Sequence, residues 1–232
     1  MKTAAAKSPW GSTPRKRDTQ FLAKREAVLQ VAARLFRERG YDGASLNEIA
    51  EILSITKPTL YYYVRNKDEL ILEIKKAAQQ QVLDFIEEAM DGPGNGYEKL
   101  RSIMIKYALL MTTDFGVCLI LVPPRSMESE SRALLYAGVE DMNHRLYRVL
   151  ASGHADGSLV VPDPVITYHV LFGSLNWMSV WYKPGGRVSA QEVVEMQVDM
   201  LLNGVRATQA KRAPPSPAAK PAKAKSAAKS RR

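Results

Sequence analysis

The chain has 232 residues, of which 46% are hydrophobic and 25% charged, a composition typical of folded globular proteins rather than of disordered or fibrous ones. Its longest uninterrupted apolar run, Val117 to Val122, has six residues, whereas a membrane-spanning helix needs about 20. No apolar stretch follows the basic N-terminal residues, so we expect no secretory signal and a cytoplasmic protein.

Cys118 is the single cysteine, which excludes an intrachain disulfide. A buried inert thiol is a better explanation for it than a redox switch.

The formal net charge of +9 is concentrated at the two ends of the chain. Residues 211–232 carry eight cations and no acid, and residues 1–18 carry five cations and one acid. The rest of the chain is mildly acidic. The C-terminal segment consists mainly of Ala, Lys, Pro, Ser and Arg, which predicts disorder. It is interpreted either as a solubilising tail or as a non-specific DNA attachment, with a membrane surface as a third alternative.

Between these arms, Pro and Gly gather at a few positions that divide the chain into segments. These positions are Gly40, Asp91–Gly96, Pro123–Pro124, Gly153–Pro164 and Pro184–Gly186. Apolar residues recur at helical spacing within the segments, and no segment alternates apolar and polar residues as a half-buried strand does. The sequence therefore predicts an all-α fold.

Two helix-start signals lie close together in the stretch Ser45–Leu70. Ser45 and Glu48 have the spacing of a capping box, which predicts the beginning of a short helix. Thr56 offers an N-cap hydroxyl, and Pro58 falls in the first turn of the next helix, where its missing amide hydrogen is tolerated. Two short helices joined by a tight turn are therefore expected.

The second short helix is expected to end near Val64, and Asn66 predicts the start of a long helix around Lys67. Leu60 and Val64 share the inward side of the second helix, while hydroxyls, a proline ring and tyrosines lie outward or on its flanks. Such a surface suits the major groove of DNA, and the helix N-termini and lysines suit phosphates. The predicted DNA-contacting residues are Ser45, Thr56, Lys57, Pro58, Thr59, Tyr61, Tyr62, Tyr63 and Lys67.

The alternative for this stretch is a well-capped three-helix packing unit without a ligand. Burying three adjacent tyrosines would require several hydrogen-bond partners at once, so a DNA-facing surface is the better interpretation.

At these residues the chain resembles the tetracycline-repressor (TetR) family of bacterial transcription regulators. The matching pieces are AARLFRERGYDGASLNEIAEILSI, TKPTLYYYVRNK and DELI, and the resemblance is strong over residues 22–72. The family implies an all-helical homodimer, in which three N-terminal helices bind DNA, a fourth leads into a ligand-binding body, and the last two long helices form the dimer interface. The chain departs from the family at Leu53–Thr56, where Ala-Gly-Val-Ser is usual, and at Val64, where Phe is common.

Four regions are predicted on this basis. They are a basic disordered arm (1–18), a helix-turn-helix DNA-binding domain (19–66), a helical effector-binding and dimerisation domain (67–210), and a disordered basic tail (211–232).

Met and aromatic residues at helical spacing in the third region form either ordinary core or an adaptable effector pocket. The segment SLNWMSVWYKPGGRVSAQEV resembles a TetR subgroup with regulators of fatty-acid, steroid and aromatic-acid breakdown, several of which respond to acyl-CoA thioesters. An acyl-CoA or related large apolar anion is therefore the expected effector, with Arg125, Arg145 or Lys183 as possible anion partners, although each is also explained as a solvated surface charge. The predicted effector residues are Tyr107, Met111, Phe115, Arg125, Tyr168, Asn176, Trp177 and Trp181.

The last two helical segments carry apolar stripes that could pair across a two-fold axis, although packing within one chain explains each residue equally well. Trp177 and Trp181 also belong to the first stripe. The predicted interface residues are Val170, Ser174, Val194, Val198, Leu201 and Val205.

The expected function is a homodimeric, ligand-responsive repressor that leaves a palindromic operator when a small effector binds. The alternative is a non-specific DNA-compacting protein that acts mainly through its basic arms.

An enzyme is not expected. The three histidines match no metal-ligand motif, and neither a Gly-rich phosphate loop nor a nucleophile elbow occurs. Asp141 and His144 could pair as a base, but a surface hydrogen bond explains them equally well. We expect no cofactor and no metal.

Overall fold

The computed structural model describes residues 14–123 and 127–204, which form helices and no strand. This confirms the predicted all-α class. The helices are α1 (Pro14–Gly43), α2 (Leu46–Ile52), α3 (Lys57–Tyr61), α4 (Lys67–Asp91), α5 (Gly96–Leu110), α6 (Asp114–Leu121), α7 (Ser129–Ala155), α8 (Pro164–Asn176), α9 (Met178–Trp181) and α10 (Ala190–Leu202).

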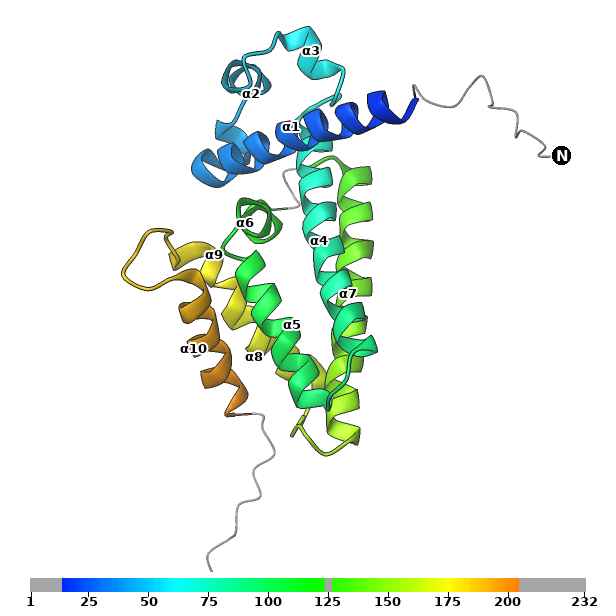
Figure 1. The fold of residues 1–232 in the computed structure, drawn as a ribbon, viewed down its shortest axis with the longest axis vertical. Helices are drawn as coiled ribbons and strands as arrows, with labels where there is room; N and C mark the ends of the chain where they lie inside the picture. The colour runs from blue at the N-terminus through cyan, green and yellow to red at the C-terminus, as the bar shows by residue number, and fades with distance from the viewer. Residues whose placement is uncertain (1–13, 124–126, 205–232) are drawn as a thin grey trace, which may run out of the picture.

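Figure 1 shows α1, α2 and α3 gathered at one end of the molecule, which we call the head. From the head, α4 runs beside α7 into a helical body that also contains α5, α8, α9 and α10. Helix α6 lies between the two parts and packs against both α1 and α4. The junction predicted at Gly40 is a break in α1, where the backbone adopts φ 72°. Glycine is the residue that adopts this left-handed conformation without a steric penalty.

Two hydrophobic cores are present, and α4 contributes to both. Ile71 and Ile74 are fully buried in the head core, whereas Ala78 and Val82 are fully buried in the body core. The head core also includes Cys118 of α6 and residues of α7. The boundary predicted between residues 66 and 67 therefore does not separate the two cores, because the head completes its core with side chains from α4, α6 and α7.

Three element boundaries differ from the predictions. Helix α1 begins at Pro14, so residues 14–18 of the predicted disordered arm are helical. Helix α3 ends at Tyr61, and residues up to Val64 continue as hydrogen-bonded turns, with the amide of Val64 donating to Leu60 O at 3.2 Å. Helix α8 ends at Asn176 and is followed by the short α9. Residues 1–13 of the arm and the tail 211–232 lie outside the described residues.

Polar side chains join α4 to its neighbours at the level where the two cores meet. Lys75 is 1% exposed, and its ammonium donates to Leu119 O of α6 at 2.8 Å. One turn later, Gln79 Nε2 donates to Leu135 O of α7 at 3.3 Å. Because the last carbonyls of a helix lack intrahelical partners, Lys75 satisfies one of the orphan acceptors of α6. Together these bonds fix α6 and α7 against α4.

Cys118 lies beside this junction, and its thiol donates to Ala33 O of α1 at 3.4 Å. Burial raises the pKa of the Cys118 thiol to about 12, so it stays protonated and unreactive near neutral pH. The expectation that this thiol is buried is confirmed.

Within the described ranges, no single helix has the length and apolarity needed to cross a membrane. The consecutive helices α5 and α6 reach that threshold only when taken together, and they meet at a bend of 92°.

Replacing Lys75 with methionine is expected to change how stability depends on pH. Burial lowers the pKa of Lys75 from 10.5 to about 8, so the unfolded chain holds this proton more tightly than the folded one. The wild type therefore gains stability as pH rises from 8 toward 10.5, and a Lys75→Met variant lacks this gain. Urea unfolding measures the free energy of unfolding of both proteins at pH 7.5 and pH 9.5. Between these two pH values, the wild type should gain about 2 kcal/mol of stability relative to the variant. If the free energies of unfolding of the two proteins change equally with pH, Lys75 is not buried as described.

Candidate nucleic-acid interface and effector region

The turn between α2 and α3 is built from local backbone signals. Ser45 accepts a hydrogen bond from the amide of Glu48 at 3.2 Å, which is the first half of the predicted capping box. The carboxylate of Glu48 pairs with Arg39 instead of completing it. At the turn, Ser54 adopts φ 53°. A non-glycine residue in this region costs about 1 kcal/mol or more, so the surrounding helices hold the turn with serine at the position where the family usually has glycine.

Helix α3 exposes the side chains that the sequence predicted to face outward. Thr56 caps the helix by accepting from the amide of Thr59 at 3.3 Å, and the two hydroxyls bond to each other at 2.8 Å. Leu60 is fully buried, whereas Tyr62 is 71% exposed. Lys57, Pro58, Thr59 and Tyr61 are exposed on the same short helix. The outward face therefore carries a cation, hydroxyls and exposed aromatic rings.

An aromatic cluster supports the end of α3. Phe21 of α1 packs edge-on against Tyr62, with ring centroids 5.5 Å apart, and lies 5.3 Å from the ring of Tyr63. Tyr63 is half-buried in this contact. Of the three predicted DNA-contacting tyrosines, Tyr61 and Tyr62 are thus presented outward, while Tyr63 helps to hold them in place.

Lys67 does not extend into solvent, because its half-buried side chain contacts residues of the same chain. Its ammonium donates to Tyr41 O at 2.7 Å and to Ala44 O at 3.2 Å, and it lies 4.3 Å from the centre of the Tyr41 ring. The next residue, Asp68, accepts from the hydroxyl of Tyr41 and from the amide of Glu128 at 2.7 Å. The side chains of Lys67 and Asp68 therefore join the end of α1 to α4 and α7 through hydrogen bonds.

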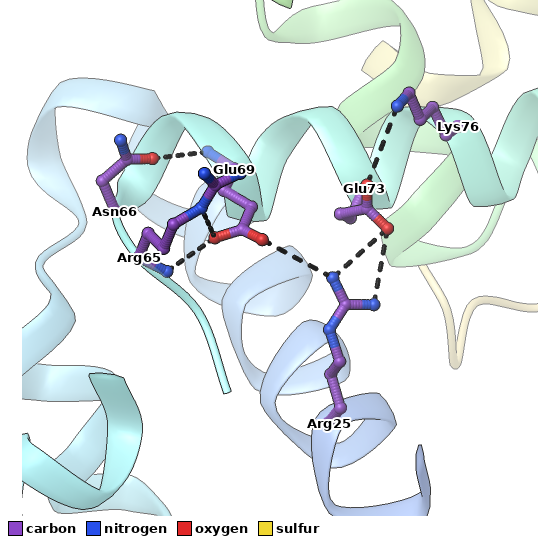
Figure 2. A network of polar contacts seen from close by, with 6 residues as sticks. All are labelled: Arg25, Arg65, Asn66, Glu69, Glu73 and Lys76. Atoms are coloured by element: carbon purple, nitrogen blue, oxygen red, sulfur yellow. Dashed lines mark hydrogen bonds and ion pairs between the residues drawn. The ribbon is translucent and has the colours of Figure 1, made fainter. Parts of the chain in front are cut away.

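A network of charged residues fixes the segment between α3 and α4, as Figure 2 shows. Arg25 of α1 reaches Glu73 at 3.3 Å and Glu69 at 3.9 Å, both on α4. Glu69 in turn accepts from the amide of Arg65 at 2.6 Å, and its own amide donates to Asn66 Oδ1 at 2.8 Å. The predicted start of a helix at Asn66 is confirmed. The network ties the exit of α3 to both neighbouring helices.

Three residues that surround the exposed end of α3 were not found from the sequence. They are Phe21 and Arg25, which support the α3 region from α1, and Arg65, whose side chain is 87% exposed next to the tyrosines. The cation directly after the tyrosine cluster was a signal for Arg65. The contacts of Phe21 and Arg25 link residues 41 to 48 positions apart and leave no local pattern.

In the body, three predicted effector residues form one cluster, in which Tyr107 and Tyr168 are buried and Asn176 is half-buried. The hydroxyl of Tyr107 donates to Asn176 Oδ1 at 2.5 Å, and burial raises the pKa of this tyrosine well above its usual range. Tyr168 and Tyr107 both contact the ring of Phe172, with centroids 5.2 and 5.1 Å away. Burial also raises the pKa of Tyr168 to about 12. Met111 belongs to the same hydrophobic core.

The other predicted effector residues lie elsewhere. Trp177 and Trp181 are 62% and 46% exposed and lie outside the cluster of Tyr107. The reason is helical phase. Residues two apart on a helix point to opposite sides, so Trp177 faces outward because Leu175 is buried. Phe115 lies at the start of α6, where it lines a cavity beside α1. Arg125 falls outside the described residues.

The two remaining candidate anion partners are surface charges. Arg145 pairs with Glu87 at 2.7 Å and with Asp141 at 3.1 Å. Lys183 is exposed.

An exposed apolar face runs along α8, α9 and α10, and it differs in part from the predicted dimer stripe. Val170 is 56% exposed as predicted, but Val194 and Val198 are fully buried in the core of their own chain, so they cannot contact a partner. Ser174 donates to Val170 O at 2.7 Å, and Leu201 is partly buried. Val205 lies outside the described residues. The large side chains on this face, at least 46% exposed, are Ile166, Val170, Trp177, Trp181, Met196 and Met200.

Two family models match this chain, one in the head region and one in the body. Residues 28–74 match the family model of bacterial regulatory proteins of the tetR family, and residues 93–205 match the tetracyclin repressor-like C-terminal domain. Among characterised relatives, the HTH-type transcriptional regulator AcrR of Shigella flexneri is 30% identical over 81% of this chain and 94% of its own length.

A second relative and a solved structure are similar over comparable lengths. The HTH-type transcriptional repressor KstR2 of Mycolicibacterium smegmatis is 24% identical over 82% of this chain and 95% of its own length. The crystal structure of AibR in complex with isovaleryl coenzyme A and operator DNA superposes with a TM-score of 0.66. It is 27% identical and covers 76% of this chain and 97% of AibR.

The internal role of Lys67 makes a stability prediction. Replacing it with methionine removes two charge-assisted hydrogen bonds and leaves two carbonyls without that donor, so unfolding should require about 1.5 to 3 kcal/mol less free energy. Lys57→Met is the matched control, because this exposed lysine should change stability by no more than about 0.5 kcal/mol. Urea unfolding of both variants measures the difference. Equal stabilities would mean that Lys67 is free in solution.

Proposed function

The chain belongs to the TetR family of bacterial transcription regulators, and on this premise we propose that it is a homodimeric repressor of a palindromic operator. In this proposal, an acyl-CoA or related large apolar anion binds the body and releases the protein from DNA. The protein acts in the cytoplasm, on the nucleoid. Family members that are similar to this chain include repressors and one regulator solved with isovaleryl coenzyme A and operator DNA.

The observation that carries the proposal is the outward face of α3. Helix α3 buries only Leu60, yet Thr56 caps it and Phe21 and Arg25 support the segment that follows it. Core packing therefore does not explain why its position is fixed. Its exposed lysine, threonine, proline and tyrosines supply apolar contacts for thymine methyls and hydroxyls for base edges and phosphates. In this proposal Ser45 and Arg65, at either side of α3, contact phosphates.

Two-fold symmetry is supported by the exposed face on α8, α9 and α10. Two tryptophans and two methionines on this face make an apolar patch that a soluble chain covers with a partner. A two-fold dimer presents two copies of α3 to half-sites about one helical turn apart, which matches a palindromic operator.

An apolar effector is supported by the composition of the body core. Tyr107, Asn176 and Tyr168 place polar groups inside a core that is otherwise aliphatic and aromatic. A few fixed polar groups within an apolar interior are typical of small-molecule sites. A ligand there must replace the bond between Tyr107 and Asn176, and so it must carry hydrogen-bonding groups of its own.

Selection from a random duplex DNA pool with the full-length protein at near-physiological salt tests the proposal. We expect enrichment of a palindrome with half-sites about one helical turn apart. Tight binding without enrichment and with a steep salt dependence would instead favour DNA compaction through the basic arms.

Tyr62→Ala should weaken binding to the selected operator about 10- to 100-fold, because a base-edge contact contributes about 1 to 3 kcal/mol of discrimination. Binding to random DNA should change less than about threefold, since phosphate contacts dominate it. Fluorescence anisotropy with both duplexes measures this. Tyr136→Ala is the control, because Tyr136 is similarly exposed (55%) but lies on α7. Equal losses on both duplexes would argue against base readout by Tyr62.

Val170→Arg should convert the dimer to monomer, because two-fold symmetry places the new charge in the interface twice. Operator affinity should fall about 100-fold or more, whereas Leu134→Arg, at a 51% exposed position of α7, should leave both properties unchanged. Light scattering after size-exclusion chromatography reports the oligomeric state. A dimeric Val170→Arg variant would place the interface elsewhere.

A further inference from the structure

The strongest positive charge of the chain does not belong to the surface that reads the operator. Residues 19–66 carry seven cations and five acids, residues 67–204 carry 12 cations and 18 acids, and residues 211–232, the basic tail, carry eight cations and no acid. We propose that the basic tail binds a second DNA duplex while the head holds the operator, so that the protein bridges two duplexes. This inference rests on the function proposed above.

The basic tail lies outside the described residues, but the described part of the chain fixes the place from which it departs. The last turns of α10 lie at the end of the body away from the head (Figure 1). There Asp199 of α10 pairs with Arg101 of α5 at 3.0 Å. Two residues earlier on α5, Lys99 donates to Met90 O in the last turn of α4 at 2.8 Å. The end of α10 is therefore level with the far end of α4.

The length of α4 separates this place from the reading helix. Helix α4 begins at Lys67, just after the α3 segment, and its 25 residues extend for about 37 Å. The chain therefore leaves α10 about 37 Å from the segment that carries α3, and the operator lies beyond that segment.

The reach of the chain decides which duplex can use the charge of the basic tail. An extended chain spans at most about 3.6 Å per residue. Lys211 and Arg212 follow Gly204 by seven and eight residues, so they lie within about 29 Å of the end of α10, less than the length of α4. The six cations from Lys220 onward could reach the operator only by following the whole body. A duplex at the far end of the body is within reach of all eight.

DNA is a stronger partner for the basic tail than the acidic body of the same chain. Duplex DNA carries one negative charge per about 1.7 Å of its axis, and cations that bind it release condensed counterions. The carboxylates of the body are dispersed, and several are already paired, as Glu87 is with Arg145 and Glu88 is with Lys106. The counterion release therefore favours DNA.

The composition of the basic tail determines the kind of binding. Its residues are Lys, Arg, Ala, Pro and Ser, with no aromatic or large apolar side chain that could stack on a base or insert into a groove. Recognition through charge alone predicts binding without sequence preference. Such binding has a Kd of about 10⁻⁴ to 10⁻⁶ M at physiological salt, and the two copies of the tail in the proposed dimer strengthen it by avidity.

The test compares three full-length proteins at micromolar concentration: the wild type, a neutral-tail variant and a permuted-tail variant. The permuted-tail variant keeps the composition of residues 211–232 in a different order, so its charge is unchanged. Each protein is bound to the selected operator on beads, and the capture of a labelled random duplex is measured. The substitutions of the neutral-tail variant are K211Q, R212Q, K220Q, K223Q, K225Q, K229Q, R231Q and R232Q.

The wild type and the permuted-tail variant should capture the second duplex equally. The neutral-tail variant should capture at least about tenfold less, while its operator affinity, measured by fluorescence anisotropy, stays within about threefold of the wild type. Eight cations predict a slope of about −7 for log affinity against log salt, so the affinity for the second duplex should fall about 100-fold between 0.1 and 0.2 M salt.

Four results would overturn the inference. Equal capture by the neutral-tail variant would mean that the heads join the two duplexes, and loss of capture by the permuted-tail variant would mean that charge alone does not explain binding. No capture by the wild type, with weaker operator binding by the neutral-tail variant, would place the basic tail on the operator duplex. No capture by the wild type, with sedimentation on phosphatidylglycerol vesicles, would assign the tail to a membrane surface.

Failure of the proposed function gives a different result. If selection enriches no operator, beads that carry a random duplex replace the operator beads. Cation-dependent capture on those beads would contradict the repressor proposal and leave the binding of a second duplex standing. Specific operator binding without any capture would do the opposite.

Discussion

The rest of the structure depends on the sharing of one helix, α4, by two hydrophobic cores. Its first turns complete the head through Ile71 and Ile74, and its later turns are buried in the body. At the level between them, the buried Lys75 satisfies a carbonyl of α6 that has no partner in its own helix. Because interiors are close-packed, a shift of α6 or α7 against α4 is transmitted to the head rather than absorbed.

The reading surface follows from this arrangement. Helix α3 is too short to be stable alone, since isolated helices need about 12 residues or more, and it buries little apolar area. Its position is instead fixed by the aromatic contact of Phe21 and by the charged network of Arg25, Glu69 and Arg65. Isolated surface ion pairs contribute little to stability, but here they connect three segments and set the direction in which Tyr62 points.

The junction between head and body is where a ligand signal and DNA binding meet in the proposed function. The Arg37–Asp114 pair and the α5–α6 backbone contact at Gly116 lie within this one small region. A ligand changes the DNA affinity only through its differential affinity for two states.

The sequence by itself determined the all-α class, the family and the helix starts at Ser45, Thr56 and Asn66, since capping and hydrophobic period depend on residues three or four apart. Only the tertiary structure decided which polar side chains bond within the chain and which apolar side chains are buried in its core. Lys67 and Val194 have the same local patterns as exposed residues, yet one donates to carbonyls 23 and 26 residues away and the other is fully buried. Long-range packing sets these outcomes, and it leaves no periodic signal along the chain.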